Sequence, residues 1–170
     1  PRDPWVHLRT GILQEQQGEQ EQALLHYKTA SEAYPDSFRI LFRRSIVTMN
    51  LLQEEESIRI HQKMIELRPE HALSLNNLAW MYLTAKDRSL RQPEKALELA
   101  LKSVELEATI DHIDTLAEAY FQKGQTAKAI ETLRKGIREA YYPKSRERYL
   151  EGQYRRFRKG DTSVSPPPVS

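Results

Sequence analysis

The chain has 170 residues, of which 39% are hydrophobic and 29% are charged, as expected for a single globular domain. It contains no cysteine, which excludes disulfides, thiol catalysis and zinc–thiolate sites. The formal net charge of +2 is too small to argue for nucleic acid as a partner, and no apolar run approaches the length of a membrane-spanning helix.

A repeat of 34 residues runs through the first half of the chain and continues, with one insertion, through the second half. The similar phrases "HYKTASEAYPD" and "HQKMIELRPE" each have a proline as the next-to-last residue, and these prolines, Pro35 and Pro69, lie 34 residues apart. The phrase "LNNLAWMYL" returns as "IDTLAEAYF" at a spacing of 38 residues, because about five residues are inserted before Ala96 and one is lost later. We therefore expect four repeats, covering residues 4–37, 38–71, 72–110 and 110–143.

Each repeat is predicted to form two helices separated by a turn. In the first repeat, Asp3 precedes Pro4, a pair typical of a helix start, and Gly18 lies at the expected turn. The third repeat has a lengthened turn at residues 85–92 and a second helix that begins at Pro93. In the fourth repeat, apolar residues follow the helical period on both sides of Gly124. No alternating segment favours a strand, so the chain is predicted to be all-α.

Two further segments follow the repeats. Residues 143–159 place Tyr149, Leu150, Tyr154 and Phe157 near one helical face with basic residues elsewhere, which predicts a basic helix that caps the last repeat. Residues 160–170, rich in Ser and Pro, have little to bury and are predicted to be disordered.

Small residues recur in phase at three positions of each repeat. The eighth position holds Gly11, Ser45, Ala79 and Ala117; the twentieth holds Ala23, Ser57, Ala96 and Ala129; the twenty-seventh holds Ala30, Met64, Ser103 and Gly136. In these positions the chain resembles the tetratricopeptide repeat family, in its bacterial type. The departures are Thr10 and Arg44 at the seventh position, Leu52 at the turn of the second repeat, and Met64 at a usually small position.

The resemblance implies a right-handed α-solenoid of antiparallel helix pairs whose first helices line a concave groove. The groove residues that it implies grade from basic through amide and aromatic to acidic: Arg39, Phe42, Arg43, Ile46, Asn50, Leu73, Asn76, Asn77, Trp80, Asp114 and Glu118. The alternative for two of them stays open, since Trp80 could pack between repeats and Asn77 could bond a neighbouring helix. Family members that clamp a chaperone's C-terminal carboxylate carry Lys, Asn and Arg at positions that here hold Leu8, Ile12, Arg43, Leu73 and Asn77, so the sequence argues against a chaperone tail.

No constellation of residues predicts catalysis, a cofactor or a metal. Asp111, His112 and Asp114 cluster in "DHID", but the simpler interpretation is that Asp111 or a neighbour caps a helix. The histidines have no ligand-like spacing, and no glycine-rich phosphate loop or G-x-S-x-G motif is present. We therefore expect a protein that is not an enzyme and needs no cofactor.

The leading hypothesis is a non-catalytic scaffold that binds a protein partner, as a peptide or helix segment, in the groove. The alternative uses the basic helix, whose candidate contacts are Arg146, Arg148, Arg155, Arg156, Arg158 and Lys159. These residues could meet nucleic acid or an anionic membrane surface, or the helix could mediate homo-oligomer formation. The simpler interpretation is a solvated cap with ordinary surface charge, so nucleic acid is disfavoured as a partner.

The compartment is not fixed by the sequence. The chain begins with Pro1 rather than Met, and no leader follows, so we expect a processed or partial chain. We expect a soluble domain, with the cytoplasm favoured and a periplasmic or membrane-tethered location left open.

Overall fold

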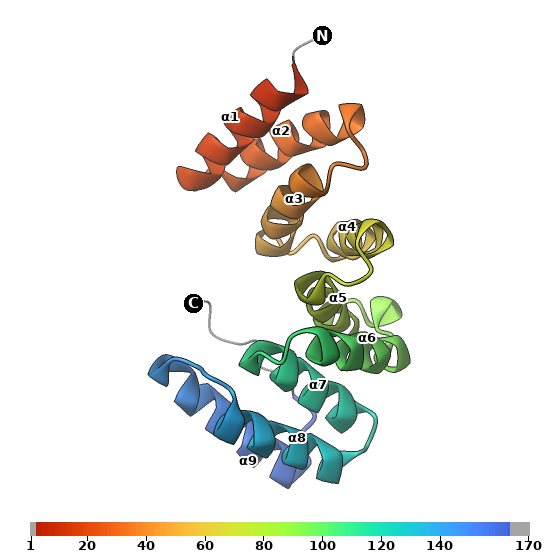
Figure 1. The fold of residues 1–170 in the computed structure, drawn as a ribbon, viewed down its shortest axis with the longest axis vertical. Coiled ribbons are helices and arrows are strands. Elements are labelled where there is room, and N and C mark those ends of the chain that lie inside the picture. The colour runs from red at the N-terminus through yellow and green to blue at the C-terminus, as the bar shows by residue number, and fades with distance from the viewer. Residues whose placement is uncertain (1–2, 164–170) are drawn as a thin grey trace. The chain divides into compact units, whose positions relative to one another are not determined.

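The chain is all-α in the computed structural model, which describes residues 3–163. Over that range it forms nine α-helices and two short 3₁₀ helices, and no strand (Figure 1). The first helices are α1 (Pro4–Gln16), α2 (Gln20–Ala33), α3 (Phe38–Asn50) and α4 (Glu54–Leu67). They are followed by α5 (Ala72–Thr84), η1 (Arg88–Leu90), α6 (Pro93–Leu106), α7 (Ile110–Gln122), α8 (Thr126–Glu139), η2 (Lys144–Arg146) and α9 (Glu147–Lys159).

Local signals in the sequence set the helix ends. The Asp3 carboxylate accepts a hydrogen bond from the Trp5 backbone N–H at 3.0 Å, and Pro4 occupies the first turn, as predicted. Gly18 and Gly124 adopt φ values of 82° and 72° at the turns after α1 and α7. Glycine carries no Cβ, so these left-handed turns are tolerated without strain.

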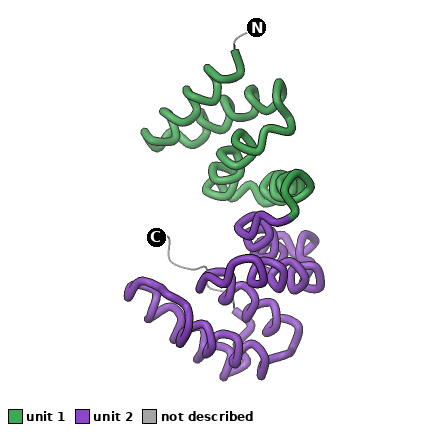
Figure 2. The backbone as a smooth tube through the Cα atoms, in the orientation of Figure 1, with its two compact units in different colours: residues 1–69 green, residues 70–170 purple. Residues whose placement is uncertain are grey.

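The described helices fall into two compact units, residues 1–69 and 70–170 (Figure 2). Unit 1 contains α1–α4, in which each helix packs against the next one along the chain. Unit 2 contains α5–α9; its helices also pack in sequence, and α5 additionally contacts α7. The partners of each pair run antiparallel, joined by short turns except between α5 and α6, where the turn is lengthened. The pairs are α1–α2, α3–α4, α5–α6 and α7–α8.

Small residues let the paired helices approach closely. A Cβ added to Gly11 would lie 2.6 Å from Cε1 of Tyr27, whose ring is fully buried between α1 and α2. A Cβ added to Gly136 would lie 2.6 Å from Cγ2 of Ile113. Both distances are well inside van der Waals contact, so the small residue at each position is a packing requirement.

Two hydrogen bonds join the two ends of the lengthened turn before α6. Arg91 Nε donates to the Ala85 carbonyl at 2.7 Å, and the Gln92 N–H donates to the Tyr82 carbonyl at 3.0 Å. Between these bonds, Lys86 and Arg88 are exposed. The insertion therefore protrudes without interrupting the packing of α5 on α6.

Helix α9 covers the end of unit 2. Leu150 and Phe157 are buried in a cluster with Phe121 and Leu133, and the rings of Phe121 and Phe157 lie 4.7 Å apart. Residues 160–163, which we expected to be disordered, follow α9 as a turn in which the Ser163 N–H donates to Asp161 at 2.9 Å. The remainder of the predicted disordered tail, 164–170, lies outside the described residues.

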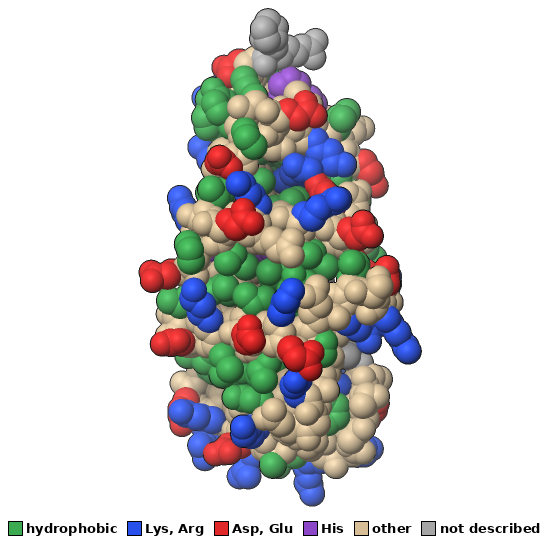
Figure 3. Space-filling model, turned by 90° about the vertical axis from the view of Figure 1, so that its right-hand side faces the viewer, with side chains coloured by type: hydrophobic (Ala, Val, Ile, Leu, Met, Phe, Trp, Pro, Cys, Tyr) green, Lys and Arg blue, Asp and Glu red, His purple; other side chains and the backbone are tan. Residues whose placement is uncertain are grey.

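The described surface is mixed in character. On the face drawn in Figure 3, hydrophobic side chains form separate clusters with charged side chains between them. None of the helices described combines the length and the apolar character that crossing a membrane requires.

Candidate functional site

Helix α3 of unit 1 carries the basic part of the predicted groove. Arg39 and Asn50 are exposed, whereas Phe42, Arg43 and Ile46 are half-buried, and the spacing of these residues places them along one side of the helix. Arg43 Nη1 lies 3.5 Å from the Glu15 carboxylate of α1, and Asn50 Nδ2 donates to Gln20 Oε1 of α2 at 3.4 Å. Phe42 packs against the cluster of Leu41, Ile60 and Met64. This face therefore offers two cationic groups above a partly exposed apolar strip.

Helix α5 of unit 2 carries the amide and aromatic part. Leu73, Asn77 and Trp80 follow the i, i+4, i+7 spacing of one helix face; Leu73 is 41% exposed, and the other two are half-buried. Asn76 is buried instead, and its side-chain oxygen has no hydrogen-bond partner among the described residues. Three of the four residues predicted on α5 therefore share one face.

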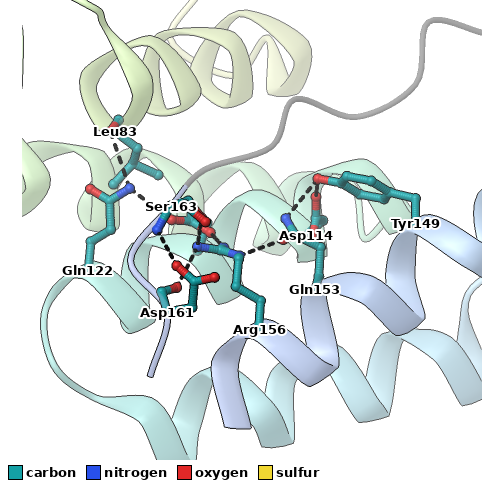
Figure 4. Close-up of polar contacts among 9 residues, drawn as sticks. Leu83, Asp114, Gln122, Tyr149, Gln153, Arg156, Asp161 and Ser163 are labelled. Atoms are coloured by element: carbon teal, nitrogen blue, oxygen red, sulfur yellow. Dashed lines mark hydrogen bonds and ion pairs between the residues drawn. The ribbon is translucent and has the colours of Figure 1, made fainter. Parts of the chain in front are cut away.

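The acidic part is not accessible, which corrects the expectation for α7. Asp114 is 4% exposed and Glu118 is 0% exposed, because side chains of α9 lie against them. Tyr149 donates its hydroxyl to Asp114 Oδ2 at 2.8 Å (Figure 4). Arg156 forms an ion pair with Glu118. The two acidic residues therefore hold α9 in place, and a ligand cannot reach them while α9 is docked.

These contacts belong to a buried polar network that joins α7 to α9 (Figure 4). Gln153 Oε1 accepts from Arg156 Nε at 2.8 Å, while Gln153 Nε2 donates to the Tyr149 hydroxyl at 2.8 Å. Gln122 Nε2 donates to Glu118 at 2.8 Å and to the Leu83 carbonyl at 3.2 Å, which extends the network to the end of α5. Nearly every polar group in the network therefore has a partner.

Four further contacts hold the Arg156 guanidinium in place. Its Nη1 donates to the carbonyls of Asp161 at 3.3 Å and Ser163 at 2.5 Å, which ties down the turn after α9. Its Cζ also lies 5.2 Å and 4.8 Å from the ring centroids of Phe121 and Phe157. The guanidinium is therefore held by a carboxylate, two carbonyls and two aromatic rings, so it is not available to an external anion.

Burial changes the acid–base behaviour of Asp114. It raises the pKa of this carboxyl from 3.8 to about 7, and the negative charges of Glu118 and Asp111 act in the same direction. The hydrogen bond from Tyr149 and the charge of Arg156 oppose the increase. Asp114 Oδ1 has no hydrogen-bond partner among the described residues, which a neutral carboxyl tolerates better than a carboxylate.

The six residues of the predicted basic helix divide into two groups. Arg146 pairs with Asp111 at 2.7 Å and Arg156 pairs with Glu118. Both acidic partners lie on α7, so these two arginines stabilise the packing of the C-terminal segment against that helix. The exposed residues are Arg148, Arg155, Arg158 and Lys159. Arg155 pairs with Glu151 of its own helix at 2.8 Å.

Sequence reasoning missed the contribution of α8 to this basic surface. Arg134 and Arg138 of α8 line a groove of about 550 Å³ together with Arg155 and Arg158 of α9. The signal was present, since Arg134 and Arg138 are four residues apart and share a helix face. The groove could not be predicted from this spacing alone, because it forms only where α8 packs beside α9.

The "DHID" segment does not assemble a metal or acid–base site. His112 Nδ1 bonds the Glu107 carbonyl at 2.6 Å, Asp111 pairs with Arg146, and Asp114 accepts from Tyr149. Thr109, a neighbour of Asp111, caps α7 by accepting from the His112 N–H. Within residues 3–163, no three His, Asp or Glu side chains gather as metal ligands.

Comparison with known proteins identifies the architecture. The family model described as tetratricopeptide repeat matches residues 6–37 and 115–145. Among solved structures, the chain is similar to MamA 41-end from Desulfovibrio magneticus RS-1, with 20% identity and a TM-score of 0.70 over 80% of this chain and 75% of that one. A crystal structure of MamA protein gives 18% identity and a TM-score of 0.77 over 92% and 81%.

A tetratricopeptide repeat protein from Parabacteroides merdae ATCC 43184 is similar at 18% identity, with a TM-score of 0.77 over 94% of this chain and 59% of that one. No curated protein matches the sequence. At these identities, the similarity to solved structures shows the fold alone. The predicted fold class, all-α with antiparallel helix pairs of this repeat type, is confirmed.

Proposed function

The chain is a tetratricopeptide-repeat protein, and we propose that it binds peptide or helix segments of a protein partner. Two faces are candidates, each considered by itself: the exposed face of α5 in unit 2 and that of α3 in unit 1. Proteins of this repeat type generally act as interaction scaffolds and are typically non-catalytic. One observation supports the proposal most directly: Leu73 and Trp80 lie on the same face of α5, and both side chains reach the surface.

The α5 face combines the two kinds of group that peptide recognition needs. Leu73 and Trp80 can bury apolar side chains of a ligand, and residues such as tryptophan often dominate binding energy at interfaces. Asn77 lies between them and carries both a donor and an acceptor, which matches the N–H and C=O groups of a peptide backbone.

The α3 face supports the same function with different chemistry. Phe42 and Ile46 supply apolar contact, and Arg39 and Arg43 supply positive charge. The Arg43 side chain remains 39% exposed beside Glu15, so it keeps capacity for a further acceptor. A segment with apolar and acidic residues would therefore be the preferred ligand of this face.

Peptides selected from a random twelve-residue display library against the whole chain provide the test. The affinity of each labelled peptide is then measured by fluorescence anisotropy for wild-type protein, Leu73→Ala and the double variant Asn77→Ala/Trp80→Ala. We expect the double variant to lose about 30-fold in affinity, because removing one anchor of this kind typically costs about 2 kcal/mol. A Trp5→Phe variant leaves Trp80 as the single tryptophan, so its emission should shift when a peptide binds.

Leu101→Ala is the matched control. Leu101 lies on α6 of the same unit and is 43% exposed, close to the 41% of Leu73, so both substitutions remove a similar apolar surface. The control should bind like wild type. Equal affinity of Leu73→Ala, the double variant and wild type, with all three folded by circular dichroism, would contradict the assignment, as would a library that yields no binding peptide.

A further inference from the structure

Four of the seven residues that line the groove between α8 and α9 are arginines. Its two sides carry Arg134 and Arg138 from α8 and Arg155 and Arg158 from α9, and all four residues are exposed. Glu151 is the one acidic residue that lines it, so the lining carries a net charge of +3. The floor contains Ile137 and Tyr154, which are partly buried against the core cluster of unit 2.

The charge of the surrounding segment reinforces this surface. Residues 126–159 contain eleven Lys or Arg and four Asp or Glu, a net charge of +7, whereas the rest of the chain sums to −5. The small net charge of the whole chain therefore conceals a strongly basic segment beside an acidic remainder. Such a segment attracts anionic ligands and accelerates their association.

The spacing of the arginines suits an extended chain of carboxylates. Arg134 and Arg138 are four residues apart on α8, which corresponds to about 6 Å along a helix axis. In an extended peptide, side chains on the same side are separated by about 6.7 Å. Guanidinium groups are well suited to carboxylates, and Arg155 of the groove already pairs with the Glu151 carboxylate at 2.8 Å.

We propose that the α8–α9 groove binds an extended acidic peptide segment whose alternate carboxylates pair with Arg134, Arg138 and Arg158. Between these pairs, the backbone of the segment packs against the apolar side chains of Ile137 and Tyr154 on the floor of the groove. This surface is separate from the α3 and α5 faces, so its test does not depend on the peptide-binding function proposed above.

The geometry of the groove favours a peptide over other anions. Single-stranded nucleic acid requires open aromatic faces for base stacking, but Tyr154 packs against the core and Arg158 Cζ lies 6.0 Å from its ring centroid. A membrane surface requires protruding apolar side chains, whereas Ile137 lies within the lining of the groove. Neither requirement applies to an acidic peptide.

The test measures binding of a dye-labelled eight-residue peptide in which Glu alternates with Ser, at low and moderate salt. Arg134→Gln/Arg158→Gln should lose at least 10-fold in affinity. Lys95→Gln/Lys102→Gln changes the net charge of the same unit by the same amount on exposed positions of α6, and should lose less than 3-fold. Glu151→Gln should strengthen binding about 3-fold, because it removes the competing carboxylate.

Three results would overturn the proposal. The first is an equal loss in the two double variants, which would mean that net charge alone attracts the peptide. The second is tighter binding of an oligothymidylate of equal charge, or of vesicles containing phosphatidylserine, than of the peptide. The third is concentration-dependent growth in mass by light scattering that the Arg134→Gln/Arg158→Gln variant abolishes without added peptide, which would make a second copy of the chain the occupant. Circular dichroism of each variant confirms that exposed substitutions leave the helices intact.

Discussion

Leu52 holds a left-handed backbone conformation at the turn between α3 and α4, with a φ of 55°. Glycine occupies the corresponding turns after α1 and α7. Leu52 is 64% exposed, so no burial compensates for this conformation. A non-glycine residue in the left-handed region costs about 1–2 kcal/mol, and glycine adds an entropic cost of roughly 0.5–1 kcal/mol in the unfolded chain.

Replacing Leu52 with Gly should therefore raise the free energy of unfolding by about 0.5–1 kcal/mol. Urea denaturation followed by circular dichroism measures the change. Leu13→Gly is the control, because Leu13 is also exposed but lies inside α1, where glycine should lower stability by about 1 kcal/mol. A loss of stability in both variants would show that the turn at Leu52 carries no strain.

Asp114 makes stability depend on pH. In the folded chain it keeps its proton to about pH 7, whereas in the unfolded chain it ionises near its ordinary pKa of 3.8. The folded state therefore binds the extra proton between these values, and the contribution of Asp114 to stability is complete below about pH 4 and lost as the pH rises through 7.

The variant Asp114→Asn lacks this proton equilibrium. We expect the stability of wild type relative to Asp114→Asn to fall by about 2 kcal/mol between pH 5 and pH 7, since each unit of pKa difference corresponds to ~1.4 kcal/mol. Urea unfolding of both proteins at the two pH values measures the difference. Asp36→Asn, a substitution at an exposed carboxylate, should show no comparable change; an equal pH response of Asp114→Asn and wild type would contradict the prediction.

At the scale of the element, α9 is held by both apolar and polar contacts. Phe157 and Leu150 fill the core cluster, and Arg156 neutralises the fully buried Glu118. Breaking a buried ion pair from one side leaves an uncompensated charge, which is more damaging than replacing both partners.

Arg156→Met should lower the free energy of unfolding by about 3–5 kcal/mol, because Glu118 would remain buried without its partner. In Glu118→Gln/Arg156→Met the buried charge is absent, and the amide introduced at position 118 can still accept from Gln122, so this variant should recover most of the loss. Urea denaturation of both variants gives the comparison. If the double variant were less stable than Arg156→Met, the ion pair would not account for the docking of α9.

The helix ends and the small-residue positions could be predicted from the sequence because they depend on neighbours within one repeat. Asp3 and Pro4 start α1, and Gly11 and Gly136 admit the residues packed against them. The burial of Asp114 and Glu118 could not be predicted in this way. Their positions in the fourth repeat predict that they lie on an open face of α7. Tyr149 and Arg156, which follow 35 and 38 residues later in the chain, cover that face.

At the scale of the whole chain, the two units differ in how they complete their cores. Unit 1 consists of two helix pairs, whereas unit 2 has two helix pairs and α9, which closes the exposed side of its last pair. Repeat proteins generally need about three repeats before they are stable, and a terminal helix can supply the missing cover.

We therefore expect residues 70–163 to fold alone and residues 70–143 to fail, because the shorter fragment lacks Leu150 and Phe157 and exposes Glu118 and Asp114. Circular dichroism and urea denaturation of the two fragments measure helix content and cooperativity. Cooperative unfolding of residues 70–143 with the same midpoint as the longer fragment would show that α9 is dispensable for folding.

The turn at residues 85–92, whose ends are joined by hydrogen bonds, is a suitable place to insert additional sequence. Its ends are drawn together by the bonds from Arg91 to Ala85 and from Gln92 to Tyr82, while residues 86–89 remain in solvent. Exposed loop tips with joined ends tolerate inserted sequence well. A fluorescent reporter or an affinity tag placed after Asp87 would therefore give an internal handle on this protein that leaves both chain ends and the basic groove unoccupied.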